Sequence, residues 1–158
     1  VNAVYNQANM VLVVLDNSTT AMTGHQPHPG TGRTVMGEIV QKINIEQVLR
    51  GIGVTEIETI NPLELEASVS CVKRMAEKSG VRAIIFKAPC IAVTRPKAPL
   101  HVNQDSCIGC KKCIRDLGCP AIVMNDGKIC IDASMCTGCH LCSQVCPVCA
   151  IAGGDDHE

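Results

Sequence analysis

Ten of the twelve cysteines lie between residues 107 and 149, and their spacing is that of iron–sulfur ligands. Two short segments each hold three cysteines at C-x2-C-x2-C spacing, and a Cys-Pro pair follows each segment. Three thiolates this close in sequence can wrap three irons of one [4Fe–4S] cube, while the cysteine before proline reaches the other cube. The pattern therefore predicts two clusters. Cluster one takes Cys107, Cys110, Cys113 and Cys146, and cluster two takes Cys136, Cys139, Cys142 and Cys119.

The two segments are copies of one motif, offset by 29 residues. The first copy departs from the usual spacing, because five residues, Ile114 to Gly118, separate its third cysteine from its Cys-Pro. Zinc prefers paired cysteines with a longer spacer, and disulfides need an oxidising compartment, so both fit less well. The remaining cysteines are expected to be buried hydrophobic side chains, with a spare ligand as the alternative for the last two. These are Cys71, Cys90, Cys130 and Cys149.

The cysteines also mark a change of composition that divides the chain. Only two of them precede residue 100, and residues 94–99 hold two prolines and two cations, which is typical of a short exposed connector. We therefore predict two domains, residues 1–94 and 95–158. In the second, Asn125-Asp126-Gly127 between two apolar runs predicts a hairpin.

The first domain has the pattern of an α/β fold. Residues 10–15 form a continuous apolar run, which predicts a strand buried on both faces of a parallel sheet. Helices are predicted after Asn44 and after Asn61. The inward face of the second is expected to consist of Leu65, Val69, Val72 and either Met75 or Ala76. Two further strands are predicted at residues 57–60 and 81–86. The alternating order indicates α/β, with the cysteine-rich domain expected to be α+β and ferredoxin-like.

Polar residues follow the first predicted strand, at the edge of a parallel sheet where ligands bind. Asp16 and Asn17 come directly after the strand, and a loop rich in hydroxyl groups continues to Gln26. Considered as single residues, Asn17 would be interpreted as a turn residue and His25 as a histidine of a surface loop, with no role in binding. The run from Asp16 to Gln26 as a whole resembles the thiamine-diphosphate loop of 2-oxoacid:ferredoxin oxidoreductases, and the resemblance extends over essentially all of the chain.

The resemblance implies thiamine diphosphate and Mg²⁺ as cofactors. It implies the side-chain oxygen of Asn17 and the backbone carbonyl of Thr19 as Mg²⁺ ligands, and oxygen donors suit this hard cation. Asp16 is implied to support the loop. The residues implied to line the cofactor or substrate side are Thr20, Met22, Thr23, Gly24, His25 and Gln26.

The resemblance also implies a reaction. Such an enzyme oxidatively decarboxylates indolepyruvate or other arylpyruvates to acyl-CoA and CO₂, and passes electrons through two [4Fe–4S] clusters to an external ferredoxin. A beta subunit is the implied partner, in a hetero-oligomer. The family's upstream Gly-Asp pair does not fit in the residues before the first strand, so we expect the chain to be the carboxyl-terminal part of a larger subunit and inactive alone.

Two alternatives stay open. The chain could be an electron-transfer ferredoxin module fused to an α/β domain that binds no cofactor. It could also belong to the same enzyme class acting on pyruvate or another 2-oxoacid, since no residue in it is identified as reading an aryl group.

Charge and hydropathy exclude other classes. The formal net charge is −1, so the chain lacks the excess of basic residues that is typical of nucleic-acid-binding proteins. No apolar run approaches the 18 or so residues that a membrane span needs, and no leader peptide is recognisable. The sequence therefore predicts a cytoplasmic protein.

Overall fold

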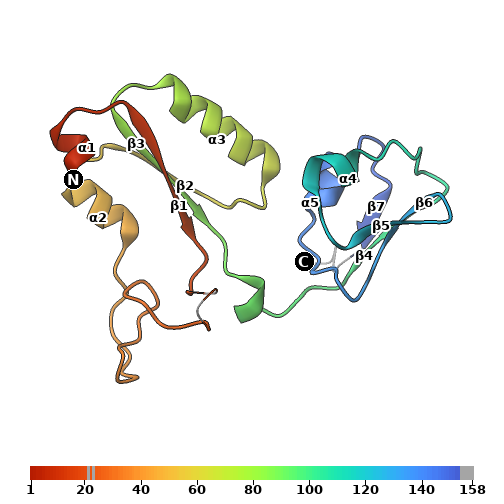
Figure 1. Ribbon diagram of the computed structural model, residues 1–158, viewed down its shortest axis with the longest axis horizontal. Coiled ribbons are helices and arrows are strands. Elements are labelled where there is room, and N and C mark those ends of the chain that lie inside the picture. The colour runs from red at the N-terminus through yellow and green to blue at the C-terminus, as the bar shows by residue number, and fades with distance from the viewer. Residues whose placement is uncertain (21, 23, 154–158) are drawn as a thin grey trace. The chain divides into compact units, whose positions relative to one another are not determined.

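The computed structural model describes residues 1–20, 22 and 24–153. The chain forms two compact units, Val1–Thr94 and a second that begins at Arg95 (Figure 1). We call them the α/β unit and the cysteine unit. None of the helices in the described ranges is long and apolar enough to cross a membrane.

A three-stranded parallel sheet forms the centre of the α/β unit, with the strand order β1-β3-β2. Its strands are β1 (Met10–Asp16), β2 (Glu56–Ile60) and β3 (Val81–Lys87). Its helices are α1 (Asn2–Tyr5), α2 (Ile45–Gly51), α3 (Leu65–Glu77) and the short 3₁₀ turn η2 (Ile91–Val93). The predicted α/β fold class is therefore confirmed.

The two faces of this sheet carry separate apolar clusters, because side chains alternate along β3. Ala83 and Ile85 pack with Leu49 of α2 on the face that α1 also covers. Ile84 points to the opposite face, where it packs with Cys71 and Met75 of α3. Helices thus cover both faces of the sheet, as Figure 1 shows. The expectation that Cys71 is a buried hydrophobic side chain is confirmed.

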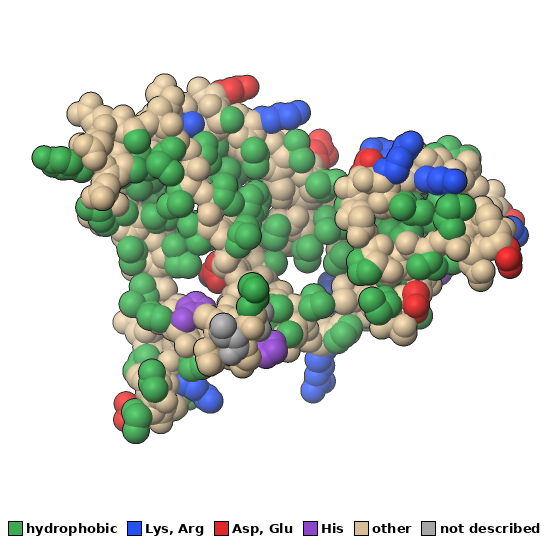
Figure 2. Space-filling model, viewed as in Figure 1, with side chains coloured by type: hydrophobic (Ala, Val, Ile, Leu, Met, Phe, Trp, Pro, Cys, Tyr) green, Lys and Arg blue, Asp and Glu red, His purple; other side chains and the backbone are tan. Residues whose placement is uncertain are grey.

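The inward face of α3 agrees with the predicted one at Met75 but not at Val69 and Val72. Ser68, Cys71 and Met75 are buried, whereas Val69 and Val72 are 45% and 44% exposed. The aliphatic residues of α3 recur at the same helical spacing as the buried ones, so periodicity could not choose between the two stripes. Apolar surface consequently remains on this unit, and hydrophobic side chains are visible across it in Figure 2.

Met75→Ala should lower the free energy of unfolding by about 2–5 kcal/mol, because Met75 is fully buried and its loss leaves a cavity. The control is Val72→Ala, one turn earlier on the same helix. It should change the free energy by no more than about 0.5 kcal/mol, since Val72 faces solvent. Denaturant titration followed by circular dichroism measures both, and equal effects would contradict the packing of α3.

An ion pair joins α3 to β2, between Arg74 Nη2 and Glu58 Oε2 at 2.5 Å. The hydrogen bond from Arg74 lowers the pKa of Glu58 below its ordinary value of 4.5. A carboxyl with a lowered pKa stabilises the fold above its unfolded-state pKa, and the stabilisation is lost as the pH falls through the folded-state pKa.

Glu58→Gln should therefore lower the melting temperature at neutral pH, and the difference from wild type should shrink as the pH drops below about 4. Thermal melts across this pH range measure the effect. Glu77→Gln, an exposed position near the end of α3, serves as the control and should show no such pH-dependent difference. A constant difference at all pH values would show that the ion pair is not its cause.

The cysteine unit consists of two strand pairs and two short helices. Strand β4 (Leu100–Val102) pairs with β7 (Ile151–Gly153), and β5 (Ile122–Asn125) pairs with β6 (Lys128–Ile131), both antiparallel. The helices are α4 (Lys112–Leu117) and α5 (Leu141–Val145). The predicted hairpin is confirmed, because Asp126 and Gly127 have φ of 47° and 77°, as a tight turn between strands requires.

Candidate functional site

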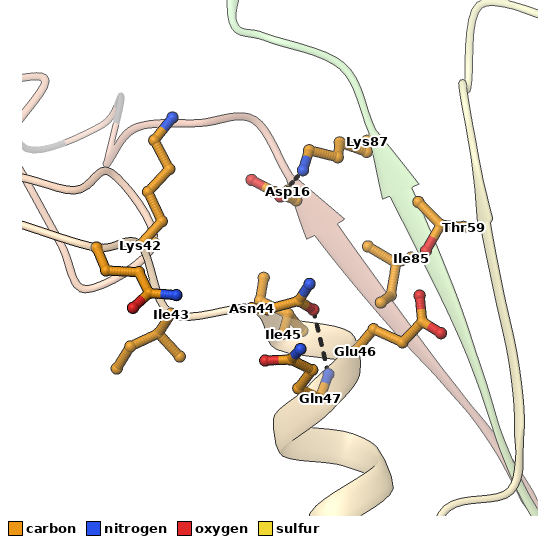
Figure 3. A pocket seen from close by; sticks show the side chains of 12 residues that line it. Asp16, Lys42, Ile43, Asn44, Ile45, Glu46, Gln47, Thr59, Ile85 and Lys87 are labelled. Carbon is orange, nitrogen blue, oxygen red and sulfur yellow. Dashed lines mark hydrogen bonds and ion pairs between the residues drawn. The ribbon is translucent and has the colours of Figure 1, made fainter.

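The carboxyl end of the parallel sheet brings two opposite charges together. Asp16 ends β1, Lys87 ends β3, and the strand register places them side by side. Lys87 Nζ lies 3.7 Å from Asp16 Oδ2, and Figure 3 shows the two side chains facing each other. Asp16 Oδ1 also accepts the N–H of Ser18 at 3.1 Å, so this carboxylate ties the following loop to the end of the strand.

Two cavities flank Asp16. The larger, of about 430 Å³, lies between the sheet edge and the start of α2, where Lys42, Asn44 and Lys87 contribute polar groups (Figure 3). The smaller, of about 280 Å³, is mostly apolar, and Phe86 and Asn17 are among the residues that line it. The larger cavity has the size and the few convergent polar groups of a small-molecule site.

The wall of the larger cavity is fixed by the start of α2. Asn44 Oδ1 accepts the N–H of Gln47 at 3.1 Å, which is the dashed line within α2 in Figure 3. This side-chain cap confirms the predicted helix start.

The two proposed Mg²⁺ ligands, Asn17 and Thr19, belong to one tight turn. Asn17 Oδ1 accepts the N–H of Thr19 at 3.2 Å, and the Asn17 carbonyl accepts the N–H of Cys90 at 2.9 Å. Thr19 is 8% exposed, and Ser18 between them has a φ of 62°. An amide oxygen has two lone pairs, so Asn17 Oδ1 keeps one for a cation. The donor set fits a hard cation such as Mg²⁺.

The remainder of the loop closes on itself. Thr20 Oγ1 donates to the Gln26 carbonyl at 2.7 Å, and the His25 N–H donates to the Thr20 carbonyl at 3.2 Å. Gly24 has a φ of 93°, a conformation that glycine adopts without strain. Met22 is fully exposed.

These loop residues line neither cavity beside Asp16. Among the residues proposed to bind thiamine diphosphate or Mg²⁺, the structure brings Asp16 and Asn17 to a cavity. Thr23 lies outside the described residues.

Sequence reasoning missed Lys42, Thr59 and Lys87, which line the larger cavity. A signal for two of them was present. Thr59 and Lys87 stand at the carboxyl ends of their strands, where ligands bind in open α/β sheets. That rule applies to the ends of all three parallel strands.

In the cysteine unit, the four cysteines assigned to cluster one line a single cavity, together with apolar side chains such as Ile129 and Ile151. They are Cys107, Cys110, Cys113 and Cys146. Burial raises the pKa of the Cys113 thiol, and the nearby Cys110 and Cys146 sulfurs add to the rise. Cys146 therefore approaches the first copy of the motif, although it belongs to the second.

The second set of cysteines is also assembled across the repeat. Burial raises the pKa of the Cys142 thiol to about 11, and the neighbouring sulfurs of Cys139, Cys136 and Cys119 contribute to this rise. Cys119 belongs to the first copy. The structure thus places Cys146 near the cysteines of the first copy and Cys119 near those of the second.

Backbone donors point at one sulfur of each set. The Ala150 N–H donates to Cys146 Sγ at 3.2 Å, and the Leu100 N–H donates to Cys136 Sγ at 3.5 Å. Such donors stabilise negative thiolates and tune the potential of a bound cluster. Within the described ranges, no three His, Cys, Asp or Glu side chains converge on a position for a single metal ion. Thiols around a cavity with N–H donors suit iron–sulfur ligation.

The 29-residue repeat is a repeat of backbone conformation. Gly109 and Gly138 have φ of 66° and 68°, and Lys111 and His140 have φ of 60° and 62°. The longer spacing of the first copy is absorbed at the end of α4, where Gly118 takes the left-handed conformation before Cys119. The two additional residues therefore leave the cysteine loop itself unchanged.

The cysteines left without an assigned role differ in burial. Cys90 and Cys130 are half-buried, and Cys130 pairs with Val123 in the β5–β6 hairpin. The expectation of burial is wrong for Cys149, which is exposed. Its N–H donates to the Cys146 carbonyl at 3.3 Å in a tight turn with a φ of 50° at Cys149. That turn contains Pro147 and leaves the Cys149 side chain exposed.

Comparison with known proteins extends over both units. An indolepyruvate oxidoreductase subunit IorA from Methanothermobacter thermautotrophicus is 45% identical over 154 residues, which are 96% of this chain and 25% of that protein. Proteins of the same name from Archaeoglobus fulgidus and Thermococcus kodakarensis are each 40% identical, over 93% and 92% of this chain. The chain spans about a quarter of the length of these relatives. No solved structure matches it.

The family described as thiamine pyrophosphate enzyme, C-terminal TPP binding domain, matches residues 1–86. The matched range contains the Asp16–Asn17 turn and most of the wall of both cavities. The chain therefore belongs to the thiamine pyrophosphate enzymes, and its α/β unit corresponds to their TPP-binding domain.

Proposed function

We propose that the chain is part of a thiamine-dependent oxidoreductase. The enzyme oxidatively decarboxylates indolepyruvate and other arylpyruvates to acyl-CoA and CO₂, and passes electrons through two [4Fe–4S] clusters to ferredoxin. One observation carries the proposal: a TPP-binding unit and a unit with two sets of four cysteines stand on one chain. Relatives named indolepyruvate oxidoreductase match at least 92% of that chain, and so match both units.

When bound, thiamine diphosphate supplies carbanion chemistry, and iron–sulfur clusters carry electrons one at a time. The residues of the α/β unit bind and position the thiamine diphosphate and its Mg²⁺. The Asn17 side-chain oxygen and the Thr19 carbonyl hold Mg²⁺. Asp16, held by Lys87 and Ser18, keeps their turn at the end of the strand. The residues proposed for the cofactor or substrate side are Thr20, Met22, Thr23, Gly24, His25 and Gln26.

The two lysines that line the larger cavity could bind an anionic group of the cofactor or substrate. Lys42 and Lys87 bring positive side chains to a cavity that also contains Asp16 and Glu46. A lysine ammonium is a compact point charge that suits phosphate and carboxylate oxygens. The cavity is therefore suited to the diphosphate group or to the carboxylate of a 2-oxoacid.

The test is substrate profiling of the intact enzyme, in which this chain works with the rest of its subunit and the beta subunit. Indolepyruvate, phenylpyruvate and pyruvate are compared with CoA present, and the reduction of ferredoxin is followed by absorbance. We expect kcat/KM to be highest for the arylpyruvates and turnover to require thiamine diphosphate and Mg²⁺. The 158-residue chain alone should not decarboxylate.

Two outcomes would favour other functions. A higher kcat/KM for pyruvate would retain the enzyme class but change its substrate. No retention of thiamine diphosphate by the intact enzyme would favour an electron-transfer module fused to a non-catalytic α/β domain.

A further inference from the structure

The two copies of the cysteine motif have the same backbone but different surroundings. A Cβ added to Gly138 in the second loop would lie 2.7 Å from the Ala98 carbonyl oxygen and 2.7 Å from Lys97 Cβ. The Lys97 N–H also donates to the Thr137 carbonyl at 3.2 Å, so residues 97–98 cover the second loop. A Cβ added to Gly109, the equivalent position of the first loop, would meet nothing within 4 Å. The first loop is therefore open.

Exposure of the thiols follows the same asymmetry. Cys110 is exposed, whereas the other seven proposed cluster ligands are buried or half-buried. Ile108, two residues before it, is 66% exposed. Because electron transfer between proteins falls off steeply with distance, an exposed ligand gives a short route between a cluster and an external carrier. Cluster one has such a ligand, and cluster two does not.

Positive charge is also confined to the first copy. Lys111, Lys112 and Arg115 are exposed, and the residues 29 positions later are His140, Leu141 and Gln144. Lys112 pairs with Asp116. For Lys111 and Arg115, by contrast, the described part of the chain provides no ion pair.

Lys and Arg side chains gather in Figure 2 on the part of the unit where Figure 1 places α4. The acidic side chains close in sequence are Asp105 and Asp116, and Asp116 is already paired. The Lys, Arg and Asp side chains around the open loop therefore leave an excess of positive charge.

We propose that Ile108, Cys110, Lys111 and Arg115 form the docking surface for an acidic iron–sulfur electron carrier, and that cluster one is the exit for electrons. The proposal rests on the proposed function, because it requires cluster one. Ile108 gives the surface an apolar centre, and the cations around it attract an acidic partner. In the transfer, cluster one is oxidised by one electron and the [4Fe–4S] centre of the carrier is reduced by one, with no bond or proton moved.

The test measures binding of the reconstituted full chain to an acidic two-[4Fe–4S] ferredoxin by isothermal titration calorimetry at an ionic strength of about 0.1 M, where the Debye length is about 10 Å. Lys111→Glu with Arg115→Glu should weaken binding about tenfold or more, because both cations face the partner. The matched control is Lys73→Glu with Lys128→Glu, two exposed lysines outside the open loop. It has the same change of charge and should alter binding less than about threefold, since exposed charges away from the interface are screened.

A second readout locates the surface. Carbodiimide joins lysine amines to carboxylates, so cross-linking to the ferredoxin followed by peptide mapping should identify Lys111 or Lys112. Equal weakening by both double variants, or cross-links confined to Lys97 and Lys128, would overturn the proposal. If the wild-type chain holds about eight irons yet does not bind, docking fails while the cluster assignment stands. If the chain takes up no iron, the proposed function itself fails.

Discussion

Cys146→Ala should remove cluster one and leave cluster two, so that iron after anaerobic reconstitution falls from about eight to about four per chain. The expectation rests on geometry, because Cys146 lines the same cavity as Cys107, Cys110 and Cys113. A [4Fe–4S] cluster needs a thiolate at each iron for stable retention, and no other residue of that cavity can replace the missing thiolate. Iron and sulfide assays, with the cluster absorbance, measure the loss.

Double variants reveal which cysteines act together. Cys146→Ala with Cys110→Ala removes two ligands of the same proposed set, so the chain should still hold about four irons. Cys146→Ala with Cys139→Ala removes one ligand from each set, and iron should fall nearly to zero. An uncrossed arrangement, in which each copy of the motif ligates its own cluster, predicts the reverse pattern for these two variants.

Cys149→Ala is the matched control. Cys149 lies three residues after Cys146 and is exposed, and it is not assigned to either set. We expect this variant to keep about eight irons. A loss of four irons from it would make Cys149 a ligand and would require a new assignment of the sets.

Asn17→Ala should weaken the binding of thiamine diphosphate and Mg²⁺ in the intact enzyme about 100-fold or more. Groups that merely orient a metal ligand are worth about 10–100-fold, and Asn17 is proposed as a ligand itself. The same oxygen accepts the N–H of Thr19, so the variant loses the turn that presents both proposed ligands. The measurement is activity against cofactor concentration, at saturating substrate.

Two further variants separate ligation from folding. Asn17→Asp retains an oxygen at the same position, for Mg²⁺ and for the Thr19 N–H, and should restore most of the affinity. Asn125→Ala, in the β5–β6 hairpin of the other unit, should leave cofactor binding unchanged. If Asn17→Asp binds the cofactor as weakly as Asn17→Ala, Asn17 is not an oxygen ligand.

Much of the fold could be predicted because its signals are local. Asn44 caps α2 through a bond to the backbone three residues later, and Asp126 and Gly127 turn the β5–β6 hairpin. The apolar run of β1 marked a strand buried in a parallel sheet. The cysteine spacing predicted which thiols lie close together, because ligand geometry restricts which sequence positions can reach one cluster.

Features that depend on distant contacts could not be predicted. The buried face of α3 is set by the strands beneath it, and so Val69 and Val72 face outward although the sequence predicted them on the inward face with Met75. Lys42 reaches the larger cavity only through the path of a long loop. The outward direction of Cys149 depends on the turn in which it lies. In each case the local sequence is compatible with more than one arrangement.

The crossed grouping of cysteines has a consequence for how the cysteine unit folds. Cys146 lies 39 residues after Cys107, yet both line one cavity, and β4 pairs with β7 across the whole length of the unit. Each proposed set of four thiols takes three from one copy of the motif and one from the other, so neither copy alone holds all four ligands of a cluster. A bound cluster then acts as a cross-link that closes a long loop and lowers the conformational entropy of the unfolded chain. With the clusters bound, the two halves should therefore fold and unfold as one cooperative piece.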